Sequence, residues 1–218
     1  MSRQFTASES RILDDIIKNR RSVRQFKKDP LTEELITTIL TAGLWAPYAA
    51  LAVSTSYDFR QFYVIPQGSE KLVRINDTIK EFSKGLLNQF EQQMNANPFV
   101  RENGKNFYQR LMTVVQEGVS GLIDAPCLII VAEKKGFPPA EKQSLAHVME
   151  NMWLKSVSLN LGFRLLSIFE NLNESKEFCE ILGAEYGKYA FNGCIIGYPQ
   201  NSPNEGKRAK LEEVVYWL

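Results

Sequence analysis

The segment around which the rest of this chain is arranged is R-R-S-V-R-Q-F, residues 20–26. Three guanidiniums and one hydroxyl fall within five residues, directly after a segment whose apolar residues have helical spacing. Arginine presents planar forks of N–H donors that match phosphate oxygens in pairs, and a serine hydroxyl adds a short contact. The segment is therefore typical of an anion-binding site. A solvated basic helix end is the alternative, because cations near a helix C-terminus are favourable in any case.

The composition limits the classes of function. The chain has 218 residues, of which 44% are hydrophobic, enough for one domain with a buried core. Its 26 basic and 25 acidic residues leave a net charge of +1, whereas general nucleic-acid or membrane-surface binders rely on a strong basic excess. The N-terminal segment lacks an apolar signal core and no run approaches a membrane span. We therefore expect a cytoplasmic protein that binds neither nucleic acid nor membranes.

Motifs for metal, hydrolytic or nucleotide-domain chemistry are missing from the sequence. Cys127, Cys179 and Cys194 are widely spaced and odd in number, which predicts buried thiols rather than a disulfide framework or a metal site. His147 is the only histidine, and it lies in an apolar helix without a G-x-S-x-G motif. There is also no G-x-G-x-x-G or G-K-[ST] motif. We expect no metal, no serine or cysteine hydrolase and no Rossmann or P-loop domain.

Apolar spacing predicts many helices and a few short strands. Helices are expected at about 9–19, 32–43, 72–97, 107–121, 139–161 and 175–182, and strands at 59–65, 127–132, 165–169 and 191–197. Ser8 or Ser10 is the expected N-cap of the first helix and Thr32 that of the second. Helices outweigh strands and their order is not a regular β-α-β alternation. This predicts an α+β fold with a small, mostly antiparallel sheet surrounded by helices.

Several segments, in order, resemble the nitroreductase family, which binds FMN. They are I-I-K-N-R-R-S-V-R-Q-F-K-K-D-P-L, A-G-L-W-A-P, V-M-E-N-M-W-L-K-S-V-S-L-N-L-G-F, I-I-G-Y-P and K-R-A-K-L-E-E-V. The resemblance implies a single nitroreductase-like domain over residues 1–218 that forms a dimer. Residues 66–121 carry no family motif and correspond to a variable helical excursion of the family.

The resemblance also implies an FMN site. In the family's pattern, Arg20, Ser22, Arg208 and Lys210 match phosphate contacts, and Arg24 matches a cation near the flavin N1 and C2 carbonyl. Backbone N–H groups at residues 167–169 match positions near the flavin N5. No catalytic side chain is expected, because the cofactor carries the redox chemistry. The full set of expected cofactor-binding residues is Arg20, Arg21, Ser22, Arg24, Pro47, Tyr48, Ala49, Ser167, Ile168, Phe169, Arg208 and Lys210.

Two positions depart from the family's pattern. After Ala46-Pro47 the family commonly has a Ser and then an Asn that contacts the flavin, whereas this chain has Tyr48 and no Asn. Residues 167–169 are bulkier than the small residues that the family usually carries there. Flavin binding is therefore expected to be retuned, weakened or lost relative to other members.

The activity implied by the resemblance is an oxidoreductase in which NADH or NADPH reduces FMN and departs before an electron-poor acceptor, such as a nitroaromatic or quinone, is reduced. The family's two-fold dimers hold the flavin between subunits. Apolar residues at Trp45, Trp153, Phe163 and 216–218 fit such an interface, with an intrachain core as the alternative. Two other functions stay open: a non-catalytic flavin- or ligand-binding dimer, and a specialised flavin enzyme such as a reductive dehalogenase.

Overall fold

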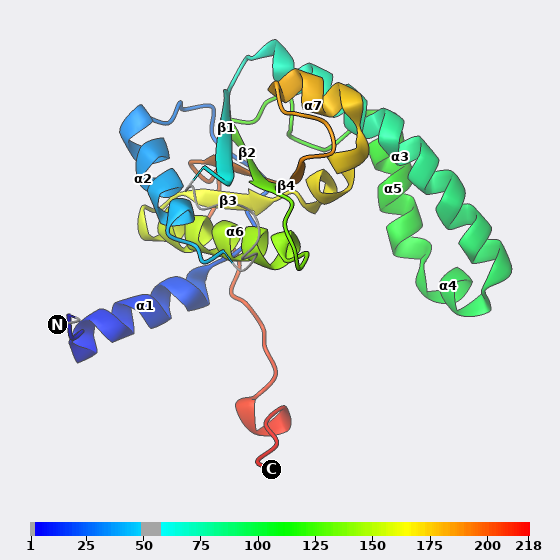
Figure 1. Cartoon of the computed structure of the whole chain (residues 1–218). Coiled ribbons are helices and arrows are strands. Elements are labelled where there is room, and N and C mark those ends of the chain that lie inside the picture. The colour runs from blue at the N-terminus through cyan, green and yellow to red at the C-terminus, as the bar shows by residue number, and fades with distance from the viewer. Residues whose placement is uncertain (1–2, 49–57) are drawn as a thin grey trace.

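A four-stranded sheet lies between two layers of helices in the computed structural model, which describes residues 3–48 and 58–218 (Figure 1). The elements in chain order are α1 (Ala7–Asn19), α2 (Glu33–Leu44), β1 (Arg60–Pro66), α3 (Glu70–Ala96), α4 (Pro98–Asn103), α5 (Lys105–Glu117), β2 (Cys127–Lys134), α6 (Glu141–Ser158), β3 (Gly162–Leu165), the 3₁₀ helix η1 (Ser167–Glu174), α7 (Lys176–Leu182), β4 (Tyr189–Gly197) and the 3₁₀ helix η2 (Leu211–Glu213).

The sheet is antiparallel throughout and has the strand order β1-β2-β4-β3. Residues of β2 alternate between two separate cores. Leu128 and Ile130 pack with α3, η1 and α7, whereas Ile129 and Val131 pack with α2 and α6. Because successive side chains of a strand point to opposite faces, a strand that is apolar at every position must be covered on both faces. The predicted α+β fold with a small antiparallel sheet is confirmed.

Helices α1 and α2 each begin after a threonine N-cap. The cap of α2 was predicted, and the cap of α1 was not. The Thr32 hydroxyl accepts from the Leu35 N–H, as expected. The first cap is Thr6 rather than Ser8 or Ser10, because Thr6 and Glu9 form a reciprocal capping box. The Glu9 carboxylate accepts from the Thr6 N–H at 2.8 Å, and this hydrogen bond lowers the pKa of Glu9.

The region from α3 to α5 forms a helical hairpin that projects from the sheet (Figure 1). Helix α4 was not predicted, because Asn97-Pro98 is also a typical end for the preceding helix. Asn97 also caps α4, and Pro98 occupies its first turn, where the missing N–H costs nothing. Helix α5 ends at Glu117, four residues before the predicted end, because Gly118 has a φ of +82°.

The prediction of a strand at residues 165–169 was wrong. β3 ends at Leu165, and residues 167–174 form η1. Leu166, Phe169 and Leu172 are buried, so the apolar residues recur every third position, which is the period of a 3₁₀ helix. A strand would need a period of two.

The two ends of the chain differ from its centre in burial. Helix α1 has no buried residue and extends away from the sheet, and the C-terminal segment also projects (Figure 1).

Cys127, Cys179 and Cys194 are buried and unpaired, as predicted. Within the described part of the chain, no helix is long and apolar enough to cross a membrane.

Candidate functional site

The basic segment 20–26 runs as an extended chain between β3 and the end of β4. The Val23 N–H donates to the Phe163 carbonyl at 3.0 Å, and the Lys27 N–H donates to the Tyr198 carbonyl at 2.9 Å. Val23 is buried. Because side chains alternate along an extended chain, its neighbours Ser22 and Arg24 point outward, and both are exposed.

Gly162 allows this close approach. A Cβ at this position would lie 2.9 Å from two atoms of the Val23 side chain and 3.0 Å from the Phe26 ring. Any larger residue would push the basic segment away from β3. The Leu161-Gly162 pair that ends the α6 region therefore positions Ser22 and Arg24 through their backbone.

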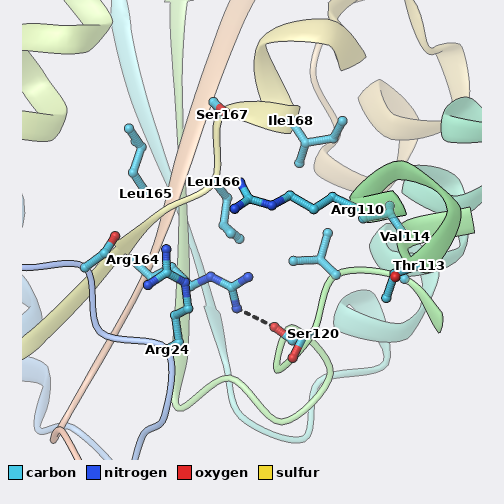
Figure 2. Close-up of a pocket in the computed structure, with 13 residues that line it drawn as sticks. Arg24, Arg110, Thr113, Val114, Ser120, Arg164, Leu165, Leu166, Ser167 and Ile168 are labelled. Carbon is cyan, nitrogen blue, oxygen red and sulfur yellow. Dashed lines mark hydrogen bonds between the residues drawn. The ribbon is translucent and has the colours of Figure 1, made fainter. Parts of the chain in front are cut away.

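A cavity of about 630 Å³ opens beside this segment. Figure 2 shows Arg110 reaching from α5 into this cavity, with Arg24 and Arg164 on its opposite side. None of the lining residues is an aspartate or a glutamate. They are Ser22, Arg24, Arg110, Thr113, Val114, Gly118, Val119, Ser120, Arg164, Leu165, Leu166, Ser167 and Ile168.

The three cavity arginines lack carboxylate partners. None of Arg24, Arg110 and Arg164 forms an ion pair with another residue among 3–48 and 58–218. Arg164 donates through Nη1 to the Ser120 carbonyl, which keeps its guanidinium in the cavity wall (Figure 2). Burial and the nearby Arg24 charge lower the pKa of Arg164. An uncompensated positive field of this kind favours a bound anion.

The first turn of η1 adds backbone donors to the same cavity. Ser167 and Ile168 line it and are the first two residues of η1. The first N–H groups of a helix have no acceptor within the helix, so these two are available to a ligand. Phe169 differs, because its N–H donates to the Leu166 carbonyl at 3.3 Å and its side chain is fully buried in the core.

The cavity rim after α5 is fixed by α3. The buried Asn76 side chain accepts from the Val119 N–H at 2.9 Å. Gly118 packs against the same amide, and a Cβ there would lie 2.2 Å from Asn76 Nδ2. Asn76 therefore sets the path of residues 118–120, which brings the Ser120 carbonyl to Arg164.

The other expected phosphate contacts lie outside the cavity lining. Arg20 forms an ion pair with Glu150 at 2.9 Å, and its guanidinium lies 4.3 Å from the centre of the Trp153 ring. Trp153 and Phe163 belong to the core, so for these two residues the intrachain alternative holds rather than the interface.

Arg208 is brought back to the basic segment by the C-terminal stretch. A Cβ on Gly206 would lie 2.2 Å from Arg21 Nη1 and 3.7 Å from Arg208 Nη1, so both guanidiniums lie close to this backbone. Lys210 is exposed, two residues further on. The structure therefore brings the C-terminal residue Arg208 near the basic segment, and the neighbour there is Arg21 rather than Arg20.

The segment after α2 lies at the other edge of the sheet. The Tyr48 hydroxyl donates to the Lys134 carbonyl at 3.0 Å, and its ring stacks on Phe59 at 4.1 Å between centroids. The Pro47 carbonyl accepts from the Ser144 hydroxyl at 3.2 Å. Pro47 and Tyr48 lie beside β1 and β2, whereas the cavity lies beside β3 at the opposite edge of the sheet. A single chain therefore does not bring Pro47 and Tyr48 to its own cavity. Ala49 lies outside the described residues.

Two of the three cavity arginines, Arg110 and Arg164, were not predicted from the sequence. Arg164 directly follows the segment that ends in Leu161-Gly162-Phe163, and the period of two in a strand over 162–165 places it on the face opposite Phe163. Arg110 lies in the region without a motif, and no local signal indicates that it reaches the basic segment. Within the described residues, no group of His, Cys, Asp and Glu side chains could hold a metal.

The donor set fits a flat ligand that carries a phosphate. Guanidiniums and the Ser22 hydroxyl match phosphate oxygens, and the backbone N–H groups of η1 match ring heteroatoms or carbonyls. Apolar side chains of Leu165, Leu166 and Ile168 complete the lining, as is usual for a ring-binding pocket.

Comparison with known proteins gives one consistent family. The sequence profile of the nitroreductase family matches residues 17–198. A relative described as an NADPH-dependent oxidoreductase from Staphylococcus saprophyticus is 23% identical over 201 residues, which cover 90% of this chain and 68% of the relative.

Solved structures share the fold. A nitroreductase with bound FMN from Bacteroides fragilis superposes with a TM-score of 0.66 at 20% identity, covering 94% of this chain and 98% of that one. A BluB-like flavoprotein from Clostridium difficile gives a TM-score of 0.67 at 20% identity, with the same coverage of 94% and 98%.

Proposed function

Because the chain belongs to the nitroreductase family, we propose that it is an FMN-dependent oxidoreductase that uses NADH or NADPH to reduce electron-poor acceptors such as nitroaromatics and quinones. The observation that carries this proposal is the cavity in which Ser22 and Arg24 meet the first N–H groups of η1. The names of the FMN-bound nitroreductase and of the NADPH-dependent relative support the choice of cofactor and donor.

The residues that would hold FMN are those of the cavity and its margin. Ser22 would contact the phosphate, with Arg208 and Arg21 nearby, and Arg24 would supply a cation beside the ring. The N–H groups of Ser167 and Ile168 would donate to the ring edge. When bound, FMN supplies the relay of hydride equivalents that no side chain can provide.

The chain's own contribution is to position and polarise. Fixed N–H donors and guanidiniums act on developing negative charge without reorganising, and they act more strongly where water is excluded. Asn76 holds the 118–120 rim, and Gly162 lets the basic segment pack on β3, so both set the positions of the donors. The roles of Arg20 and Lys210 in binding phosphate stay predictions.

We also propose that the active form is a homodimer. Ile12 and Leu13 of α1 are 60% and 51% exposed, and Tyr216, Trp217 and Leu218 are more exposed still. Large apolar groups in this arrangement are usually covered by a partner. A second copy would also offer its Pro47-Tyr48 segment to the cavity, which this chain does not do for itself. Sedimentation equilibrium should give twice the mass of one chain, and a monomer at micromolar concentration would contradict the proposal.

The test of the proposed function is the visible absorption spectrum of the purified protein, before and after anaerobic addition of NADPH or NADH. Flavin bands that bleach would support the proposal. A protein that stays colourless with excess FMN would overturn it and favour a ligand-binding dimer.

Arg208→Ala should retain less flavin, because Arg208 is exposed and donates only to the adjacent Lys207 carbonyl among described residues. Arg74→Ala, which removes the same charge from an exposed position on α3, should leave flavin content unchanged.

A further inference from the structure

Asn192 is a polar residue in the middle of the buried strand β4. It is 3% exposed, and residues 193–197 that follow it are also buried. Asparagine is disfavoured within strands, and a buried amide lowers stability unless it is hydrogen-bonded. Both ends of this amide have partners. Oδ1 accepts from the Gly193 N–H at 2.8 Å, and Nδ2 donates to Glu170 Oε1 at 2.9 Å. Asn192 therefore links the sheet to η1.

The contact with Gly193 lies where β3 stops pairing with β4. Leu166 follows the last residue of β3 and lies opposite Gly193. Its N–H donates to the Gly193 carbonyl at 2.8 Å, and in a continuing antiparallel ladder its carbonyl would accept from the Gly193 N–H. That carbonyl accepts instead from the Phe169 N–H at 3.3 Å, inside η1. The Asn192 side chain thus satisfies the donor that β3 leaves behind, and the chain can turn into η1 here.

The contact with Glu170 fixes the direction of η1. A 3₁₀ helix has poorer hydrogen-bond geometry than an α-helix, so contacts outside the helix help to hold its direction. Phe169 supplies one of them, because its ring lies against Gly193, where a Cβ would be 2.5 Å from Phe169 Cδ2. A single point of contact leaves the helix free to rotate about it. The Asn192–Glu170 hydrogen bond, on the next residue of η1, supplies a second point and removes this freedom.

These two anchors directly follow the donors of the cavity. Figure 2 shows Ser167 and Ile168, the first two residues of η1, beside the cavity. Within the described part of the chain, neither Glu170 nor Asn192 lines the cavity, so both would act on a ligand only through the backbone of η1. Displacement of a positioned group by about 1 Å is enough to change reactivity strongly.

We propose that Asn192 and Glu170 are positioning residues of the flavin site, whose hydrogen bond holds the N–H groups of Ser167 and Ile168 toward the cavity. This inference rests on the proposed function, because it concerns the same cofactor. Donors held at the ring edge stabilise the reduced flavin, which carries more negative charge, more than the oxidised flavin. Loss of the hydrogen bond should therefore weaken FMN binding and shift the flavin midpoint potential to a more negative value.

Two substitutions of Glu170 that remove the same charge separate the hydrogen bond from the charge. Glu170→Gln keeps a side-chain carbonyl that can accept from Asn192 Nδ2, whereas Glu170→Ala keeps no acceptor. Fluorescence titration should give a Kd for FMN about fivefold higher for Glu170→Ala than for Glu170→Gln. A redox titration with protein in excess over FMN should give the more negative midpoint potential for Glu170→Ala. This potential belongs to bound flavin, so a general loss of stability does not produce the difference.

Glu174 provides a matched control, because it is the exposed last residue of η1. Glu174→Ala and Glu174→Gln should not differ from each other in Kd or in midpoint potential. Adding Asn192→Ala to each Glu170 variant should remove the difference between them, because no amide remains to donate to the introduced carbonyl. If proteins with Asn192→Ala do not fold, the comparison of the two Glu170 variants alone decides.

The outcomes distinguish this inference from the proposed function. Equal Kd values and equal potentials for Glu170→Ala and Glu170→Gln would overturn the inference, and an unmodified protein whose bound FMN is bleached by NADPH would leave the proposed function intact. A difference that survives Asn192→Ala, or one of equal size in the Glu174 pair, would also overturn the inference. An unmodified protein that takes up no FMN would refute the proposed function, and the inference with it.

Discussion

Arg60 and the three arginines of the cavity use the same side chain in opposite ways. Arg60 is fully buried with Glu133, at 2.5 Å between Nε and Oε1. Its Nη1 donates to the carbonyls of Gly43 at 2.8 Å and Ala46 at 3.1 Å. Arg24, by contrast, is exposed in the cavity and forms no ion pair with a described residue.

The difference teaches which charges serve the fold and which serve a ligand. Arg60 closes the end of α2 against β1 and β2, so its donors are used up by the protein. Burial raises the pKa of Glu133, and the Arg60 guanidinium opposes this rise. The cavity arginines leave their donors to be used by something that binds. Arg164 is intermediate, since it is half-buried and gives one donor to the Ser120 carbonyl.

The largest expected effect is that of Arg60→Ala on stability. Removing one partner leaves the Glu133 carboxylate buried without its cation, which typically costs about 3–5 kcal/mol of the free energy of unfolding. Urea unfolding followed by tryptophan fluorescence measures this loss.

The double variant Arg60→Ala/Glu133→Gln sharpens the comparison. If the stranded carboxylate causes the loss, the neutral amide should recover part of it, and the double-mutant cycle should show coupling between the two residues. A loss below about 1 kcal/mol for Arg60→Ala would mean that the pair does not hold the α2 end in place.

An intermediate effect is expected for Tyr48→Phe, which probes the same corner. The Tyr48 hydroxyl donates to the Lys134 carbonyl, and loss of one such hydrogen bond costs about 1 kcal/mol. Burial, with the nearby Glu133 charge, raises the pKa of Tyr48 to about 12. Below pH 10 the folded and unfolded states both keep the proton, so the advantage over Tyr48→Phe should be constant.

Between pH 10 and about 12 the unfolded tyrosine loses its proton while the folded one keeps it. The folded state then binds more protons, so its stability falls as pH rises and the advantage over Tyr48→Phe should shrink. Unfolding curves of both proteins at matched pH values measure this. Tyrosinate absorbance near pH 10 from Tyr48, seen as the difference between the two spectra, would contradict the assignment.

Sequence patterns were informative where one short segment determines the outcome. The Thr32 cap and the strand predicted from the apolar run at residues 127–132 both depend on neighbours in the sequence, and both are confirmed. Two further features also have local signals in the sequence: the Thr6–Glu9 capping box and the period of three in residues 166–172.

The remaining features depend on contacts between distant segments. Nothing near Arg60 indicates that Glu133, 73 residues away, pairs with it. Arg110 and Arg164 come from separate elements and line opposite sides of one cavity, whose rim at residues 118–120 is held by Asn76 (Figure 2). Guanidiniums are also alike in sequence, whether buried and paired or exposed and free. Only the fold distinguishes a structural arginine from one that is available to a ligand.

The smallest effect on stability, and the sharpest contrast with Arg60, is expected for Arg24→Ala. Arg24 is exposed and lies near the Arg164 charge, so its removal should change the free energy of unfolding by no more than about 0.5 kcal/mol. Its effect should appear in binding instead, where a lost charge-assisted contact raises the Kd for FMN by roughly tenfold or more. Urea unfolding and a fluorescence titration with FMN, run on the same preparation, measure the two quantities. Arg24→Lys retains the charge and should recover most of the affinity if the cation itself matters, but little if the planar fork does. An Arg24→Ala protein that unfolds as easily as Arg60→Ala and still binds FMN unchanged would place Arg24 with the structural arginines.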